Sequence, residues 1–406
     1  MTRLSTGFNS NVDIVITKGL HPPWNYGEAV AMRNIVLTLK LIRKGNVIIY
    51  SWVDKRRFKG RYLEGVHYID VDDSLNYTSL TLNSILNRIL RTCNGTILLH
   101  LSGIKEYVAY VLVKLYKVFD PYVKARNILY DFGPIPVRWR KVPRSLHLTI
   151  DGGIGQILTT SILTYNRYGK HIRMHYLPIP YVPPEELSEV VEVVKGDEDE
   201  ICHTSRDVNH IYIGYIGHLY EDRFPFKLVL KALYKLVNYM GFRDLVLKVV
   251  APEMEYNLKV SKIIENYARK LNLEKNISIA VKDISEGHKL KLLKSLEIFL
   301  FTPIKQPVTM DPPMSVIEAM ALGVPVIATE YLSLKYFIKD GINGTIINSL
   351  NSVNVLSEKI KMILKNDYLR KQIAENAQKY IFSKHYYKYV ARILGEYLEN
   401  VEINKP

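Results

Sequence analysis

Short runs rich in Ile, Val and Leu alternate along the chain with longer segments in which apolar residues recur at a helical period. The first unit predicts a strand at 12–17, a loop containing glycine and proline, a helix at 27–44 and a second strand at 46–52. The apolar positions of that helix, spaced at about 3.6 residues, are Val30, Ala31, Ile35, Leu37 and Leu41. A strand, a helix and a second strand in this order form the repeating unit of a parallel sheet.

The same alternation continues to the end of the chain. Further strands are predicted at 66–71, 96–101, 126–132, 156–161, 210–217, 245–251, 276–283, 297–303, 325–329 and 344–348, and a helical pattern occupies about 45 residues from 353 onward. Buried apolar strands separated by helices are typical of parallel sheets with right-handed crossovers. The pattern therefore predicts an α/β fold.

One stretch, at 183–200, interrupts the alternation. It begins with two prolines, and residues 184–200 hold eight acids against one lysine, which predicts an exposed linker. We therefore expect two doubly wound, Rossmann-like parallel-sheet domains, at 1–183 and 209–406, joined by an acidic linker at 184–208. Ligands of such sheets bind beyond the carboxyl ends of the strands, so a cleft between the two domains is the expected site.

Composition narrows the class of protein. The chain has 406 residues, of which 48% are hydrophobic and 23% are charged, the ordinary balance of a soluble globular protein. Its two cysteines, Cys93 and Cys202, exclude a disulfide scaffold and a CxxC zinc motif. The first residues lack the apolar region of a secretory signal, and no apolar run approaches the ~20 residues that span a bilayer. These features predict a soluble, cytoplasmic protein.

The charge is unevenly distributed. The formal net charge is +15, and residues 1–183 carry 25 Lys and Arg against 11 Asp and Glu. Two basic clusters, KRRFKGR at 55–61 and RWRKVPR at 138–144, lie in this half. A basic half favours an anionic partner such as nucleic acid, an anionic membrane surface or a phosphorylated substrate. Surplus lysines that only keep the surface soluble, with 55–61 as a solvated loop, explain the same charge.

The segment 311–329 carries the most specific chemistry. Ser315 is a candidate cap of a helix that runs to Leu322, with Gly323 as the residue that ends it. The helix is apolar on every side, so it is expected to be buried, and Glu318 is its only acid. A buried carboxylate must be paired or must face a cleft. Ser315 and Glu318 fit a capping box, but Glu318 could equally accept hydrogen bonds from two ribose hydroxyls.

This segment resembles the donor-site signature of the family 4 glycosyltransferases, which have the GT-B fold. The signature is an acid, seven residues, and then Glu-Ala-Met-Ala-x-Gly-x-Pro-Val-Ile-Ala, and residues 318–328 match its second half position by position. Residues 336–347 and 215–224 are similar to two further stretches of the family. The resemblance is specific over 209–400, whereas over 12–183 it rests on the order of strands, loops and helices.

The resemblance implies roles for several residues and also has departures. Seven intervening residues would place the first acid at Met310, whereas Asp311 leaves six, so Asp311 contacts the donor sugar only if the loop is one residue shorter. The family's phosphate-binding Arg and Lys are His218 and Arg223 here, following Gly217. Arg223 retains a charge that can hold a diphosphate. At neutral pH His218 retains neither the charge nor the reach.

The resemblance implies further candidates in the first half. Gly27, in the loop 18–30, corresponds to a glycine that lets a substrate approach a helix N-terminus, with Lys18 and His21 as candidate acceptor contacts. His100 ends a predicted strand where the family often has a histidine that faces the transferred sugar; Ser102 could take this place. The structural alternatives are an ordinary turn at Gly27 and a satisfied strand-end histidine at His100.

Together, the resemblance implies a retaining hexosyltransferase that uses a nucleoside-diphosphate sugar and neither a metal ion nor another cofactor. Glu318 would hold the ribose, Arg223 and the amides that open the helix at Ser315 would hold the phosphates, and Asp311 would orient the sugar. The basic first half predicts an anionic or lipid-linked acceptor and peripheral association with the membrane.

Two other functions fit parts of the sequence. A sugar-nucleotide epimerase has the same fold, but it needs an acid and a base, and His100 alone does not supply the pair. A nucleic-acid-associated protein fits the basic charge, but the chain has no recognised nucleic-acid motif. No specific nucleic-acid partner is therefore expected.

Overall fold

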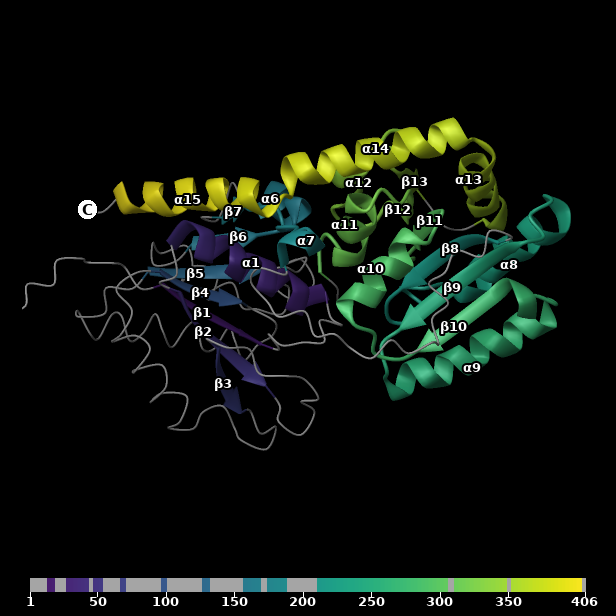
Figure 1. Cartoon of the computed structure of the whole chain (residues 1–406), viewed down its shortest axis with the longest axis horizontal. Helices are drawn as coiled ribbons and strands as arrows, with labels where there is room; N and C mark the ends of the chain where they lie inside the picture. The colour runs from purple at the N-terminus through teal and green to yellow at the C-terminus, as the bar shows by residue number, and fades with distance from the viewer. Residues whose placement is uncertain are drawn as a thin grey trace, which may run out of the picture.

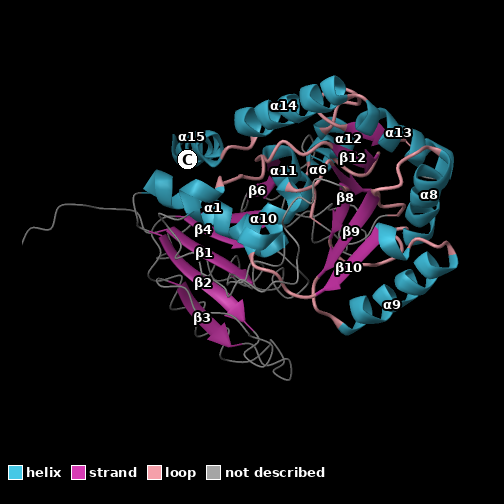
Figure 2. Ribbon diagram, turned by 45° about the vertical axis from the view of Figure 1, so that its right-hand side comes forward, coloured by secondary structure: helices cyan, strands magenta, loops and turns pink. Residues whose placement is uncertain are grey.

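The computed structural model describes residues 13–18, 27–43, 47–53, 66–70, 96–100, 126–131, 156–168, 174–187, 210–305, 310–348 and 352–403. Within these ranges the chain forms two sheets, which lie side by side with helices between them (Figure 1, Figure 2). The two sheets have the same doubly wound strand order over their first strands. The predicted α/β fold class is confirmed.

The first sheet has the order β3-β2-β1-β4-β5-β6-β7, and each neighbouring pair is parallel. Its strands are β1 (Asp13–Lys18), β2 (Val47–Val53), β3 (Val66–Asp70), β4 (Thr96–His100), β5 (Arg126–Asp131), β6 (Gln156–Thr159) and β7 (Met174–Tyr176). The described helices of this half are α1 (Gly27–Arg43), α6 (Ile162–Tyr168) and α7 (Pro184–Leu187). The apolar pattern did not predict β7, because its three residues are too few to show a period.

The second sheet has the order β10-β9-β8-β11-β12-β13 and is also parallel throughout. Its strands are β8 (Ile211–Ile216), β9 (Leu245–Ala251), β10 (Ile277–Val281), β11 (Ile298–Phe301), β12 (Val326–Thr329) and β13 (Thr345–Ile347). The helices between them are α8 (Phe226–Tyr239), α9 (Glu255–Lys270), the short η1 (Glu274–Asn276), α10 (Glu286–Lys294), α11 (Met314–Ala321) and α12 (Leu334–Phe337). All six strands were predicted from their apolar runs, and β9 is buried along its whole length.

Helix α1 is buried more completely than an amphipathic helix on a sheet. Every residue from 29 to 39 is buried, whereas Leu41, which the period assigned to the apolar face, is 47% exposed. The reason is that α1 packs against α11 and α15 in addition to the strands β1 and β2 of its own sheet. The apolar stripe therefore describes only part of the buried surface of α1.

The closing helical pattern divides into α13 (Val353–Lys365), α14 (Asp367–Lys384) and α15 (Tyr387–Ile403). The last of these returns to the first half, where it lies along α1 (Figure 1). At the start of α15, the Tyr387 amide donates a hydrogen bond to the Tyr181 carbonyl at 3.0 Å. The helix that ends the segment predicted as the second domain thus packs on α1 of the first half.

Two further predictions meet the structure only in part. Residues 184–187 of the predicted linker form α7, and the rest of the linker lies outside the described residues. The domain boundaries therefore stay a prediction. Among the helices described here, none has both the length and the apolar character that crossing a bilayer requires.

Candidate functional site

A cavity of about 330 Å³ lies between the second sheet and the start of α1. Its walls come from the loops that follow the carboxyl ends of β8, β9 and β10, from α10 and the start of α11, and from the first turn of α1. The lining residues are Gly27, Glu28, Ile216, Gly217, His218, Arg223, Val250, Ala251, Pro252, Lys282, Asp283, Ile284, Lys289, Met310, Pro313, Met314, Ser315 and Glu318. The cavity thus occupies the predicted position beyond the strand ends of a doubly wound sheet.

Helix α11 places Glu318 at the wall of this cavity. The helix begins at Met314 with Pro313 as its N-cap, and no side chain caps it, so the prediction that Ser315 is the cap is wrong. Proline at this boundary loses nothing by lacking an amide hydrogen, because the first amides of a helix have no partner within the helix. The helix ends as predicted, with Gly323 at φ +72° just after Leu322.

Glu318 pairs with a lysine of the neighbouring helix. Its carboxylate is 2% exposed, and Oε1 accepts from the Nζ of Lys289 at 2.6 Å. Oε2 is buried and has no hydrogen-bond partner among the described residues. The prediction of a buried acid that is paired or faces a cleft is confirmed in both respects, since Glu318 also lines the cavity. The capping-box interpretation is wrong, because the carboxylate turns to Lys289 and not back to the start of its own helix.

Burial disfavours the negative charge of Glu318, whereas the neighbouring Lys289 favours it. Burial raises the pKa of the Glu318 carboxyl above its ordinary value, and nearby Lys289 only partly offsets this effect. Glu286, one turn before Lys289 on α10, adds a further rise. A carboxylate of this kind gains from any donor that reaches Oε2, because hydrogen bonds to charged groups contribute about 1.5–3 kcal/mol.

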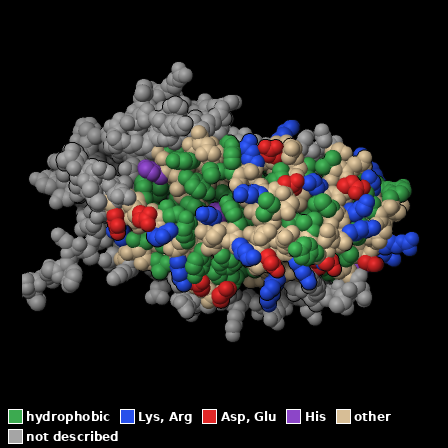
Figure 3. All heavy atoms as spheres, turned by 90° about the horizontal axis from the view of Figure 1, so that it is seen from above, with side chains coloured by type: hydrophobic (Ala, Val, Ile, Leu, Met, Phe, Trp, Pro, Cys, Tyr) green, Lys and Arg blue, Asp and Glu red, His purple; other side chains and the backbone are tan. Residues whose placement is uncertain are grey.

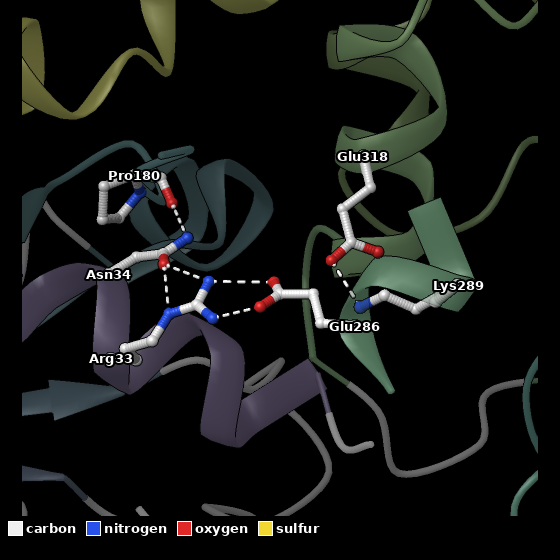
Figure 4. A network of polar contacts seen from close by, with 6 residues as sticks. All are labelled: Arg33, Asn34, Pro180, Glu286, Lys289 and Glu318. Atoms are coloured by element: carbon white, nitrogen blue, oxygen red, sulfur yellow. Dashed lines mark hydrogen bonds and ion pairs between the residues drawn. The ribbon is translucent and has the colours of Figure 1, made fainter. Parts of the chain in front are cut away.

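Helix α10 also connects the site to the first half of the chain (Figure 4). Arg33 of α1 forms a two-pronged ion pair with Glu286, in which its Nη2 donates to Oε1 at 3.0 Å and its Nη1 donates to Oε2. Arg33 also donates to the Oδ1 of Asn34, whose Nδ2 donates to the carbonyl of Pro180 at 2.9 Å. Burial alone would raise the pKa of Glu286, but Arg33 lowers it below the ordinary value.

The loop after β8 forms a second wall. Gly217 has φ +151°, and a Cβ there would lie 2.9 Å from the Tyr215 hydroxyl oxygen, so only glycine fits. The Nε of Arg223 is buried without a hydrogen-bond partner in the described part of the chain, and the guanidinium lies 5.8 Å from the Phe301 ring. Burial and the charge of Arg223 lower the pKa of His218 to about 4. His218 is therefore neutral at pH 7, and Arg223 is the cation of this wall.

Asp311 is held away from the cavity. Its carboxylate is fully buried and accepts hydrogen bonds from the hydroxyls of Ser161 and Ser333 and from the Ser333 amide at 3.1 Å. It does not line the cavity, although its neighbours Met310 and Pro313 do. Burial raises the pKa of Asp311, and these hydrogen bonds lower it in part. The geometry joins the start of α6 to the start of α12, and it offers no support for the predicted contact with a donor sugar.

Among the described residues of the first half, the first turn of α1 lines the cavity. Gly27 is the first residue of α1 and lines the cavity, as the prediction for this loop required. His100 ends β4, where it is buried, and it does not line the cavity. The side chain of Lys18, the residue His21 and the two basic clusters lie outside the described residues. Their roles remain predictions.

Sequence reasoning missed the basic residues that face Glu318 and Glu286. Lys289 precedes the buried Leu292 and Leu293 by three and four residues, which puts it on the buried side of α10. Arg33 likewise lies in the apolar stripe of α1. A charged residue at an apolar helix position was the available signal, since such a residue needs a partner.

Comparison with known proteins identifies the family of the second half of the chain. Residues 203–380 match the model of the family described as "Glycosyl transferases group 1". Residues 203–380 thus form a glycosyltransferase domain of this family, and the chain as a whole has the GT-B fold. No curated protein matches the chain in sequence.

Solved structures match the fold over the whole chain. A glycosyltransferase from Rickettsia africae is 16% identical with a TM-score of 0.71, and the match covers 98% of this chain and all of that one. Anabaena Alr3699/HepE, solved in complex with UDP and glucose, is 12% identical with a TM-score of 0.68, covering 96% of this chain and all of that one. WaaG, a glycosyltransferase involved in lipopolysaccharide biosynthesis, is 16% identical with a TM-score of 0.60, covering 95% and 99%.

Proposed function

We propose that this glycosyltransferase binds a nucleoside-diphosphate sugar in the cavity between its two halves and transfers the sugar with retention of configuration. The observation that carries the donor assignment is the unpaired Oε2 of Glu318. It is a buried carboxylate oxygen at the wall of the cavity whose other oxygen is already held by Lys289. Two vicinal hydroxyls of a ribose supply the donors that such an oxygen lacks.

The diphosphate lies between Arg223 and the start of α11. The planar guanidinium of Arg223 can donate several hydrogen bonds to phosphate oxygens. Its buried Nε has no hydrogen-bond partner among the described residues. The opening residues of α11, Met314 and Ser315, line the cavity, so this helix N-terminus borders the same space. A helix N-terminus favours negative charge. Both groups stabilise the charge that develops on the leaving diphosphate as the glycosidic bond breaks.

The nucleobase occupies the part of the cavity formed by 250–252 and 282–284. This part combines apolar side chains, such as Val250 and Ile284, with the backbone groups of two strand ends. The solved complexes of Anabaena Alr3699/HepE with UDP and with UDP-glucose support testing uridine donors first.

The acceptor approaches from the first half, where Gly27 lines the cavity and Lys18 and His21 belong to the same predicted loop. We propose an anionic or lipid-linked acceptor, because residues 1–183 carry the excess of positive charge. On the face drawn in Figure 3, positive and negative side chains are interspersed. Loss of sedimentation with anionic vesicles, after Lys55, Arg56, Arg57, Lys59 and Arg61 are all changed to Ser, would support an anionic membrane as the source of the acceptor.

The donor assignment is tested by binding. Thermal shifts with UDP, GDP, ADP and dTDP should show stabilisation by at least one of them, by about 2.7 kcal/mol at 100 times its Kd. Glu318→Gln should weaken that binding by about tenfold or more, because it removes a charged acceptor. Glu330→Gln, at an exposed acid outside the cavity, is the matched control and should bind as the wild type does.

Three outcomes count against the proposal. If no nucleoside diphosphate stabilises the protein, the donor site is wrong. Binding that survives Glu318→Gln unchanged would remove Glu318 from it. If a nucleotide sugar changes its own configuration without an acceptor, the protein is an epimerase. Retention is tested by the anomeric configuration of the transferred sugar in the product, read by NMR.

A further inference from the structure

The part of the cavity that adjoins α1 is lined by methionine. Met310 and Met314 are 5% and 3% exposed, and both line the cavity. A Cβ built on Gly27 would lie 3.5 Å from the Met310 Sδ and 3.5 Å from the Met314 Cβ. These two side chains therefore pack directly against the start of α1, on the side of the cavity from which the acceptor approaches.

Several polar residues that line the cavity come from other elements, whereas Glu28 and Ser315 are the sequence neighbours of Gly27 and Met314. Arg223 belongs to the loop after β8, and Glu318 and Lys289 face each other between α11 and α10. Asp311, which follows Met310 in sequence, does not line the cavity. Both of its carboxylate oxygens accept hydrogen bonds from Ser161 and Ser333. The acid that lines the cavity beside Gly27 is Glu28, an exposed residue of the first turn of α1.

We propose that Met310 and Met314 form an apolar subsite that selects a deoxy sugar as the transferred group. This inference rests on the proposed function, because the donor sugar must follow the diphosphate from Arg223 toward Gly27. A methyl or methylene group of a deoxy sugar packs against the two thioether chains. The corresponding hydroxyl of the parent sugar would lose its hydrogen bonds to water there and would find no strong acceptor in a thioether sulfur.

The expected size of the preference is limited. An apolar pocket rejects a ligand that merely adds a hydroxyl by up to about 100-fold, whereas a site built around a hydrogen bond discriminates far more strongly. We therefore expect a deoxy sugar to bind about 10- to 100-fold more tightly than its parent. Replacement of Met310 by a hydrogen-bonding side chain should abolish or reverse this preference.

Competition binding with matched donors tests the subsite. The nucleoside diphosphate that binds most tightly is used with glucose, 3-deoxyglucose, 4-deoxyglucose and 6-deoxyglucose attached, and each Kd is divided by that of the free diphosphate. At least one deoxy sugar should show the tighter ratio in the wild type. Met310→Gln and Met310→Glu should lower the deoxy preference by about tenfold or more, while Met310→Leu, which stays apolar and similar in size, should retain it.

Controls separate this subsite from the rest of the site. Met362→Glu, at an exposed methionine of α13, should retain the wild-type ratios. Binding of the free diphosphate by every variant reports that the variant is folded and that the donor site is present. If the diphosphate binds neither to the wild type nor to any variant, the proposed function fails together with the subsite.

The inference is overturned if the diphosphate binds normally but no deoxy sugar binds more tightly than glucose. It is also overturned if the ratio is the same in wild type and Met310→Gln. If the Kd ratio changes in Glu28→Gln but not in the Met310 variants, Glu28 and not Met310 determines which sugar is preferred.

Discussion

Two regions on either side of the start of α11 hold their carboxylates in opposite ways. Before the helix, Asp311 is fully buried, and both of its oxygens accept hydrogen bonds from Ser161 and Ser333. Within the helix, Glu318 is equally buried, but one oxygen is held by Lys289 and the other has no partner among the described residues. Burial raises the pKa of both carboxyls.

The difference indicates what each carboxylate does. A satisfied buried acid that joins residues 150 positions apart stabilises the arrangement of the two halves. A buried acid with an unused oxygen lowers stability unless a ligand completes it, and such strain is typical of binding sites. The resemblance implied that both acids contact the donor, and of the two only Glu318 lines the cavity.

The largest expected effect is on stability. Asp311→Ala should lower the free energy of unfolding by about 3 kcal/mol or more, because it leaves two hydroxyls and an amide without their acceptor. Glu318→Ala should lower it by less, about 1 kcal/mol, because the change also removes a buried oxygen that has no partner among the described residues. Urea unfolding of both variants measures the difference. Equal losses would show that the two carboxylates are not held differently.

The second effect concerns the other link between the halves, the Arg33–Glu286 pair. Arg33→Met should cost about 2 kcal/mol, because it leaves a part-buried carboxylate without its cation. Glu286 has a lowered pKa when folded, so its contribution is present above the ordinary value near 4.5 and is lost as pH falls through the lower folded value.

The pH dependence provides the check on this pair. In wild type, stability measured by thermal unfolding should fall on acidification below about pH 4.5. In Arg33→Met and in Glu286→Gln this part of the fall should be smaller. An unchanged acid profile in Glu286→Gln would mean that other carboxylates account for it.

A third, smaller effect should appear in the pH dependence of donor binding. Lys289 lowers the pKa of Glu318 against the rise caused by burial, so Lys289→Met should raise that pKa further. Binding of the nucleoside diphosphate requires the carboxylate, and it should weaken as pH falls through the raised pKa. In Lys289→Met this weakening should therefore begin at higher pH than in wild type, when measured by calorimetry.

The control for this profile is Glu318→Gln, which has no charge to titrate and should lack this pH dependence. If binding of the diphosphate weakened over the same pH range in Lys289→Met and in wild type, the ion pair with Lys289 would not govern the charge of Glu318.

The last prediction is that removal of metal ions has no effect on transfer. We expect transfer to survive EDTA, because Arg223 and the start of α11 are proposed to neutralise the leaving phosphates. Among the described residues, no group of three or more His, Cys, Asp and Glu is arranged to hold a metal ion. Activity lost on chelation and restored by Mg²⁺ or Mn²⁺ would overturn this expectation.

The main elements and the central acid of the site could be predicted from local sequence. Twelve predicted strands lie in the two sheets, and the apolar surround of Glu318 predicted both its burial and its need for a partner. The short strand β7 could not be predicted, because three residues carry no period. The cap of α11 was misassigned because serine is a common cap, whereas the prolines before it determine where the helix begins.

The sequence by itself determined the two parallel sheets, the buried helix α11 and the presence of one acid within it. These follow from local periodicity, since a buried strand or helix must be apolar wherever it packs. The tertiary structure decided which partner each carboxylate has, because Lys289 is 29 positions from Glu318 and Ser161 is 150 positions from Asp311. It also decided that α15 returns to cover α1. Such pairings depend on how whole elements pack, and no local pattern carries that information.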